Sequence, residues 1–147
     1  MKARILALRE PLARFPLSII QLAMRIGVGA VFFRSGLLKY NSWEFTVQLF
    51  RDEYKVPLLD PALAARLAMT VELAVPVFLF VGLATRLATL PLLGMILVIQ
   101  TFVYPNAWSD HLLWSSALVL ILTRGPGAFS IDRLLTRPSA RTEPRAA

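Results

Sequence analysis

Four apolar blocks separated by short polar segments dominate the pattern along the chain. They lie near residues 18–40, 61–83, 87–104 and 109–123. A helix that crosses a bilayer needs about 20 mostly apolar residues, with a lower limit of about 17. The first three blocks are long enough, whereas the fourth is short and would lie obliquely or cross only part of the membrane. The pattern predicts an all-α integral membrane four-helix bundle.

The bundle is expected to form one domain over residues 1–135, followed by a basic, Pro/Ala-rich tail over 136–147 that is expected to be disordered. One polar segment has a periodicity of its own. In the loop after the first block, Trp43, Val47, Phe50 and Tyr54 recur at helical spacing. This spacing predicts a short amphipathic helix in the first outer loop. We favour a position on the membrane surface for it, with a lid over a cavity between the helices as the alternative.

Composition and charge support a membrane protein. Hydrophobic residues make up 56% of the chain, charged residues 17%, and the mean hydropathy is +0.61, which is unlike an ordinary soluble domain. The net charge is +7, but its arginines flank apolar runs, so we expect no nucleic-acid partner. Most Lys and Arg lie in the two tails and at Arg86, whereas the opposite loops hold only Arg51 and Lys55. The positive-inside rule then predicts cytoplasmic termini in a multi-pass protein of the cytoplasmic membrane.

Charged and small residues share one face of the first block. Arg25, Gly29, Phe32, Gly36 and Lys39 align at about 100° per residue. Glycines on such a face allow another helix to approach closely. This face is therefore expected to point into the bundle.

Glu72 is the acidic residue near the centre of the second block. An isolated charge at that depth costs at least about 2.5 kcal/mol, so it needs a partner, a proton or a function. We hypothesise an Arg25–Glu72 pair, with Lys39 at the outer mouth of the same interface. Arg34 lies on nearly the opposite side of the helix, where it would extend to the headgroups or meet a partner subunit.

Three further residues could shape a site. His111 could pass protons, hydrogen-bond a quinone carbonyl or only cap the fourth helix, and Gln100 is expected to hydrogen-bond across the bundle. Pro76 is expected to kink the second helix and free a backbone carbonyl. With one His and no Cys, the chain cannot form a disulfide, a multi-His zinc site or a bis-His haem site, and we predict no metal and no covalently bound cofactor. No catalytic residue is predicted.

Three ordered motifs resemble the DoxX family of small four-helix bacterial membrane proteins. They are "RIGVGAVFFRSGLLK" at 25–39, "ELAVPVFLFVGLATR" at 72–86 and "RGPGAFSIDRLL" at 124–135. The resemblance covers roughly residues 20–135. The motif residues that it carries over, besides those of the first block and Glu72, are Gly82, Thr85, Arg86, Gly125, Pro126, Gly127 and Asp132. Arg34 and Pro76 depart from the family pattern.

The family takes its name from a subunit of a thiosulfate:quinone oxidoreductase, and relatives are linked to membrane oxidoreductase complexes and thiol stress. The resemblance therefore implies a membrane subunit of a quinone-linked oxidoreductase acting in sulfur, redox or metal stress, with its catalytic centre on a redox partner. The alternative is a non-catalytic transporter or scaffold, for which a homo-oligomer would be needed. In a third reading the intramembrane charges only hold the helices together.

Overall fold

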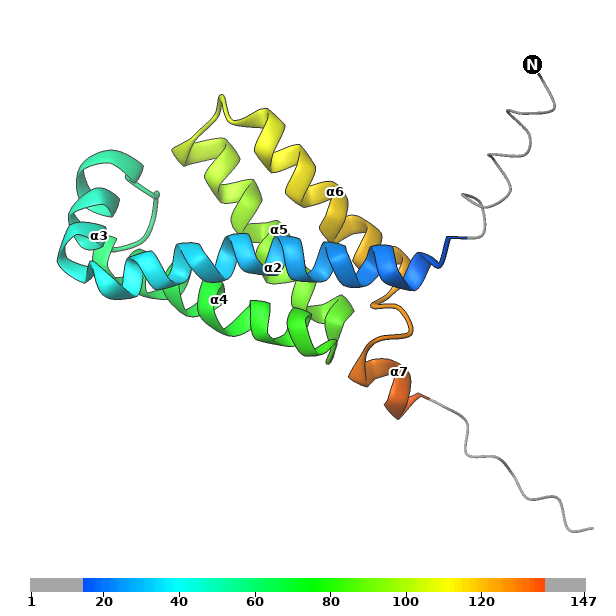
Figure 1. Ribbon diagram of the computed structural model, residues 1–147. Helices are drawn as coiled ribbons and strands as arrows, with labels where there is room; N and C mark the ends of the chain where they lie inside the picture. Colours follow the sequence, from blue (N-terminus) through cyan, green and yellow to red (C-terminus); the bar gives the residue numbers. More distant parts are fainter. Residues whose placement is uncertain (1–14, 137–147) are drawn as a thin grey trace, which may run out of the picture.

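The computed structural model describes residues 15–136, and every element within that range is helical. Of the tail predicted at 136–147, residues 137–147 lie outside the described residues, as do the basic N-terminal residues 1–14. Four longer helices are joined by short segments (Figure 1). In chain order the elements are α2 (Leu17–Asn41), α3 (Trp43–Leu49), the π-helix η1 (Phe50–Tyr54), α4 (Pro61–Val81), α5 (Thr85–Val98), the π-helix η2 (Ile99–Val103), α6 (Trp108–Arg124) and α7 (Ile131–Leu135).

Three of these helices are long and apolar enough to cross a membrane. They are Leu17–Asn41, Pro61–Val81 and the continuous α5–η2 segment Thr85–Val103. Each leaves many large apolar side chains exposed, such as Leu87, Leu90 and Leu97 on α5. In a membrane, lipid tails would cover these side chains. The fourth predicted block forms α6, which has 17 residues.

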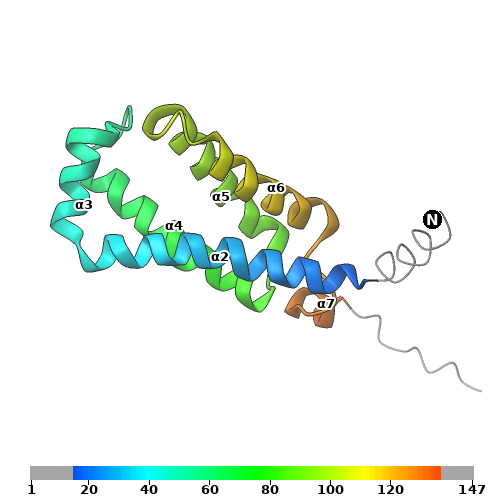
Figure 2. The ribbon, with the colours of Figure 1, turned by 45° about the horizontal axis from the view of Figure 1, so that its top comes forward.

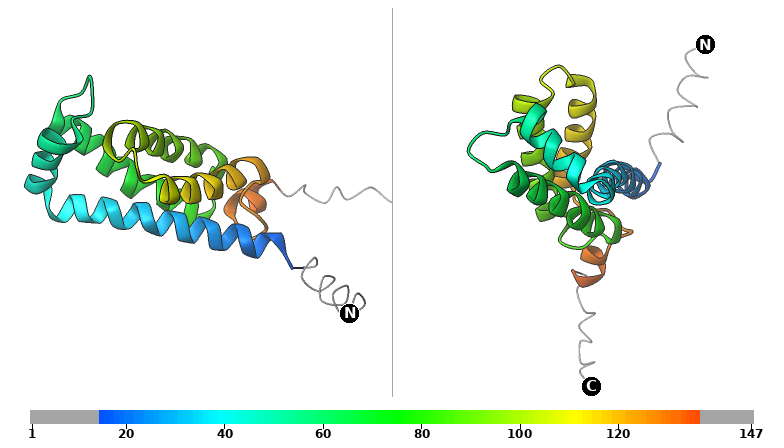
Figure 3. Two further views of the ribbon diagram at one scale, coloured as in Figure 1. Left: turned by 90° about the horizontal axis from the view of Figure 1, so that it is seen from above. Right: turned by 90° about the vertical axis from the view of Figure 1, so that its left-hand side faces the viewer.

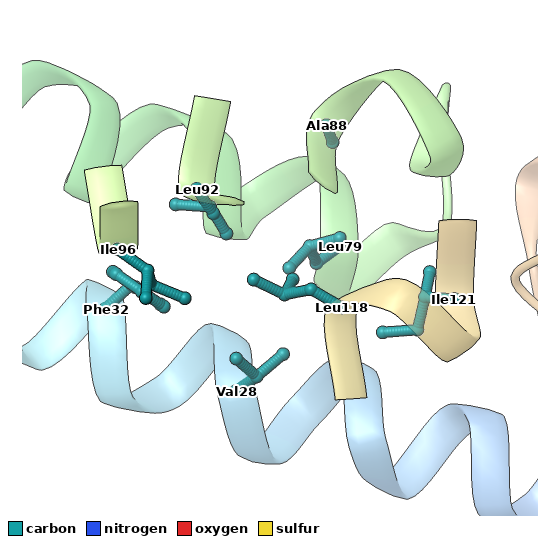
Figure 4. Packing of buried hydrophobic residues seen from close by; sticks show 8 residues of the cluster. All are labelled: Val28, Phe32, Leu79, Ala88, Leu92, Ile96, Leu118 and Ile121. Carbon is teal, nitrogen blue, oxygen red and sulfur yellow. The ribbon is translucent and has the colours of Figure 1, made fainter. Parts of the chain in front are cut away.

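The helices pack around one apolar core. Its buried side chains come from each long helix: Val28 and Phe32 of α2, Leu79 of α4, Leu92 and Ile96 of α5, and Leu118 and Ile121 of α6 (Figure 4). The ring of Phe32 meets Trp114 edge-on, with centroids 5.8 Å apart. Every long helix contributes to this cluster, so the core fixes their relative positions.

The predicted amphipathic helix is present as α3 and η1, at the end of the bundle opposite α7 (Figure 2). Its apolar face packs on the start of α4, where Phe50 joins Ala64 and Ala65 in a second buried cluster that Trp43, Val47 and Tyr54 border. The segment thus covers part of the bundle rather than lying apart from it.

At the other end, the segment after α6 folds back to the turn between α4 and α5 (Figure 3). Gly82 ends α4 at this turn, in a left-handed conformation with φ of 72°. Only glycine adopts such a φ readily, so it provides the sharp turn into α5. At the opposite end of α4, Asp60 caps the helix start by accepting hydrogen bonds from two backbone N–H groups. Pro76 lies inside α4 without ending the helix.

Candidate functional site

Glu72 pairs with Lys39. Lys39 Nζ lies 2.7 Å from Glu72 Oε2 and donates a hydrogen bond of 3.0 Å to Oε1. Ser35 joins them, accepting from Lys39 at 2.9 Å and donating to Glu72 Oε1 at 3.3 Å. The predicted Arg25–Glu72 pair is therefore wrong, because the lysine supplies the counter-charge. We call Ser35, Lys39 and Glu72 the outer triad.

Arg25 lies near the opposite end of the bundle and is 1% exposed. Its guanidinium donates to four backbone carbonyls, those of Leu79, Phe80, Pro126 and Phe129, at 2.7, 2.9, 2.9 and 2.7 Å. Two of these carbonyls end α4, and the other two belong to the segment after α6. Five donors in a fixed fork suit this bridging role. Arg34, in contrast, is exposed on α2.

Asp132 closes the same end of the bundle. Its carboxylate accepts from the N–H groups of Ala84 and Thr85, at 2.7 and 2.9 Å, and from the Thr85 hydroxyl at 2.8 Å. Asp132 thereby caps the start of α5. Burial alone would raise the pKa of Asp132, but these hydrogen bonds and the nearby Arg25 together lower it below its ordinary value.

Two glycines of the second and third motifs lie where neighbours come close. A Cβ on Gly82 would lie 2.5 Å from Ser130 Cβ, and one on Gly127 would lie 2.8 Å from Gln21 Oε1. Gln21 also donates to the carbonyl of Gly125 at 2.9 Å. Of the other motif residues in this region, Pro126 offers a carbonyl to Arg25, and the exposed Arg86 extends over Gly125. The second and third motifs thus meet at one joint, which we call the inner joint.

Gly29 and Gly36 lie where α4 packs against α2. A Cβ on Gly29 would lie 2.7 Å from the Phe80 ring, and one on Gly36 would lie 2.9 Å from Leu73 and 3.0 Å from Glu72 Cβ. The two helices therefore approach so closely that larger residues would force them apart. This approach brings Glu72 within range of Lys39.

A cavity of about 410 Å³ lies beside the outer triad. All three triad residues line it, together with His111 and Trp114 of α6 and apolar residues of α4 and α5. Phe50 and Tyr54 of η1 form part of its wall. The α3–η1 segment therefore contributes to the cavity, which was the less favoured of its two predicted roles.

His111 belongs to this cavity and to a groove between α5–η2 and α6. The ring is 4% exposed, and its Nδ1 meets Gln100 Oε1. Gln100 in turn donates its amide N–H to the carbonyl of Pro105 at 2.6 Å. This orientation of the amide makes Gln100 Oε1 an acceptor, so His111 Nδ1 donates to it.

Of the five predicted polar residues, the structure brings Lys39, Glu72 and His111 to one cavity. Gln100 contacts it through His111, and Arg25 belongs to the inner joint. Ser35 was not predicted, although it precedes Lys39 by one helical turn and shares its face. The pair of Tyr54 and Tyr104 was not predicted either; their hydroxyls are 3.2 Å apart and join η1 to the residue that follows η2.

The site can bind an apolar ring and offer it a few polar contacts. Its wall is mostly aliphatic and aromatic, while its charges are paired with each other. Across the described ranges, no group of three or more His, Cys, Asp or Glu side chains could hold a metal ion. An apolar pocket with a few convergent polar groups is typical of small-molecule sites.

Comparison with known proteins identifies the family. The DoxX family model matches residues 20–105. A "Putative oxidoreductase CatD" of Bacillus subtilis is 33% identical over 108 residues, covering 69% of this chain and 77% of the relative. An uncharacterized protein of Haemophilus influenzae is 27% identical over 126 residues, covering 79% and 83%. No solved structure matched the chain. With this match over more than half its length, the chain belongs to the DoxX family of membrane proteins.

Proposed function

We propose that the chain is a membrane subunit of a quinone-linked oxidoreductase complex and that its cavity binds the quinone. In this proposal α6 is a fourth, short transmembrane helix and both termini lie in the cytoplasm of a bacterium. The observation that carries the proposal is the apolar cavity beside the outer triad. Its volume of about 410 Å³ falls in the range of small-molecule sites, about 300–1,000 Å³.

The residues present fit a quinone. Aromatic side chains from three elements, Phe32, Phe50 and Trp114, line the cavity and can pack against a flat ring. Lys39 and Glu72 bring polar atoms to the same wall. Glu72 Oε2 is buried and lies 2.7 Å from Lys39 Nζ, so the two charges are held as an ion pair at the cavity wall.

The redox centre would belong to a partner protein. A quinone becomes a quinol by taking up two electrons and two protons, and the electrons would come from the partner's centre. The chain has no cysteine and a single histidine, so its own residues would bind and orient the ring and exclude water from it. The relative named as an oxidoreductase supports an electron-transfer complex.

The test is gentle purification of the tagged full chain from its native membrane, with mass spectrometry of the proteins and lipids that accompany it. The proposal predicts a stoichiometric redox protein and bound quinone. Gly94 offers a specific variant, because it lines the cavity and a Cβ there would meet nothing within 4 Å. Gly94→Phe should fill the cavity and remove the quinone while the partner remains bound.

Gly27→Phe is the matched control, because Gly27 also has nothing within 4 Å and does not line the cavity. Quinone that stays bound in Gly94→Phe at the level of the control would contradict the assignment of the cavity. A homo-oligomer with neither quinone nor redox partner would instead favour the transporter or scaffold alternative.

A further inference from the structure

The side of the cavity where α4 faces α5 is apolar and reaches the outside of the bundle. On α5, Pro91, Gly94 and Val98 recur at helical spacing and share one face of the helix. All three line the cavity and are also exposed. On α4, Leu67 lines the cavity and is 49% exposed. We call the opening bordered by these four residues the α4–α5 slot.

The chain's own side chains leave this slot open. The two helices leave their common turn at Gly82 and diverge toward the end of the bundle that carries α3 (Figures 1 and 2). Gly94 presents no side chain to the space between them, and a Cβ there would meet nothing within 4 Å among the described residues. The slot is therefore wide enough to admit a chain of methylene or isoprenoid groups.

The slot lies at the depth of the lipid tails. Gly94 is the central residue of the span Thr85–Val103, nine residues from either end. At a rise of about 1.5 Å per residue, it lies about 14 Å from each end of the span. The hydrocarbon layer of a bilayer is about 30 Å thick, so the slot opens near its middle. A ligand reaches this opening from the lipid and not from water.

The outer end of the cavity is covered by the chain itself. The α3–η1 segment extends over it, and the buried Phe50 packs there on the start of α4. The hydroxyls of Tyr54 and Tyr104, which both line the cavity, lie 3.2 Å apart and join η1 to the residue that follows η2. A ligand from the aqueous side would have to separate this contact, whereas the α4–α5 slot requires no such change.

The polar side chains of the cavity lie on its other walls. Ser35 and Lys39 belong to α2, Glu72 to α4 and His111 to α6, whereas every residue that α5 contributes is apolar. The cavity is thus polar on one side and apolar on the side that opens to lipid. This distribution matches a ligand with a polar ring and an apolar chain, and it does not match a small polar solute.

We infer that the α4–α5 slot admits the ligand from the lipid and holds its apolar chain, so that the cavity takes a membrane-borne quinone with an isoprenoid tail. This inference rests on the proposed function and specifies the class of its ligand. The ring lies toward the polar walls, and the tail passes between Leu67 and Gly94 into the hydrocarbon layer.

The experiment compares how two benzoquinones bind to the full chain in lipid nanodiscs. One carries two isoprenoid units, and the other carries a methyl group in their place. Leu67→Trp puts an indole at the border of the slot, so the isoprenoid benzoquinone should bind at least about tenfold more weakly than to the wild type. The methyl benzoquinone fits in the cavity without using the slot, and its binding should change by less than about twofold. Val98→Trp, on the other side of the slot, should have the same selective effect.

Leu63→Trp is the matched control, because Leu63 lies one turn earlier on α4, is 47% exposed and does not line the cavity. All variants are measured in the same nanodiscs, so partition of the isoprenoid chain into lipid cancels from the comparison. If Leu67→Trp and Val98→Trp bind the isoprenoid benzoquinone as the control does, the tail does not occupy the slot and this inference is overturned, whereas the proposed function stands. Equal loss of both benzoquinones would also overturn it, because it would place the slot residues at the ring. If the wild type binds neither benzoquinone, the proposed function fails as well.

Discussion

Replacing Arg25 by methionine should loosen the inner joint and destabilise the whole bundle. The guanidinium donates four hydrogen bonds of 2.7–2.9 Å to carbonyls from two separate segments. Methionine fills similar space but has no donor, so four carbonyls lose a charged partner. Each buried carbonyl left without a donor costs about 1–3 kcal/mol.

The sum of four such losses overstates the effect, because Gln21 and Asp132 still hold the same segments and water can reach some carbonyls after relaxation. A loss of about 3–5 kcal/mol is expected, as for one partner removed from a buried charged network. For a chain of this size that is a fall in Tm of about 10–16 °C. Arg25→Lys should recover only part of it, since an ammonium has three donors and cannot span both segments.

The assay is thermal unfolding of the detergent-purified variants, monitored by circular dichroism. Arg34→Met is the matched control, because it removes an arginine from the same helix at an exposed position. Its Tm should stay within about 2 °C of the wild type. If Arg25→Met unfolds at the temperature of this control, the carbonyl bridge does not hold the inner joint.

Three further predictions test other parts of the structure. Gly36→Leu should lower the unfolding free energy by about 1–3 kcal/mol because α2 and α4 must separate, while Gly27→Leu should be neutral in the same thermal assay. Lys39→Met should cost about 3–5 kcal/mol by leaving Glu72 uncompensated, and Lys39→Met/Glu72→Gln should restore most of it; no recovery of Tm would refute a simple charge pair. The pKa of Asp132 is lowered in the folded state, so its carboxylate stabilises the fold. This stabilisation is complete above the ordinary carboxyl pKa of about 4 and is lost as the pH falls through the lowered pKa. Asp132→Asn should therefore flatten the decline of Tm below about pH 4, and an equally steep decline would assign it to other carboxylates.

The positions of the helices were accessible from sequence because they follow from apolar length and from glycine spacing. The predicted blocks near 61–83 and 87–104 match Pro61–Val81 and Thr85–Val103 closely. The short helix in the first loop followed from the spacing of Trp43, Val47, Phe50 and Tyr54. Each of these signals is local, so no knowledge of the packing was needed.

The partner of Glu72 was not accessible in the same way, because it depends on helix register. Gly36 meets Glu72 and Gly29 meets Phe80, so α2 and α4 run antiparallel in a register that places Arg25 beside the turn after α4. Because Arg25 precedes Lys39 by 14 residues, the predicted Arg25–Glu72 pair would have required a register shifted by about four helical turns. Sequence gives the depth of a charge along its own helix but not the residue opposite it.

The role of Asp132 depended on a contact over long sequence separation. Its acceptor oxygens bind the N–H groups of Ala84 and Thr85, nearly fifty residues earlier. A carboxylate in a short helix is usually exposed to water, so the local sequence alone did not indicate this cap. Thr85 and Asp132 were predicted from two separate motifs, and only the fold shows that they form one cap.

The most direct test of the proposed function is photolabelling of the full chain in native membranes with an azido-quinone, followed by peptide mapping. The account predicts labels on cavity-wall peptides that contain Phe50 and Tyr54 or His111 and Trp114. Excess quinol should compete with the label, and Gly94→Phe should abolish it. Labels confined to the lipid-facing side of α5, or labelling that excess quinol does not diminish, would contradict quinone binding in this cavity.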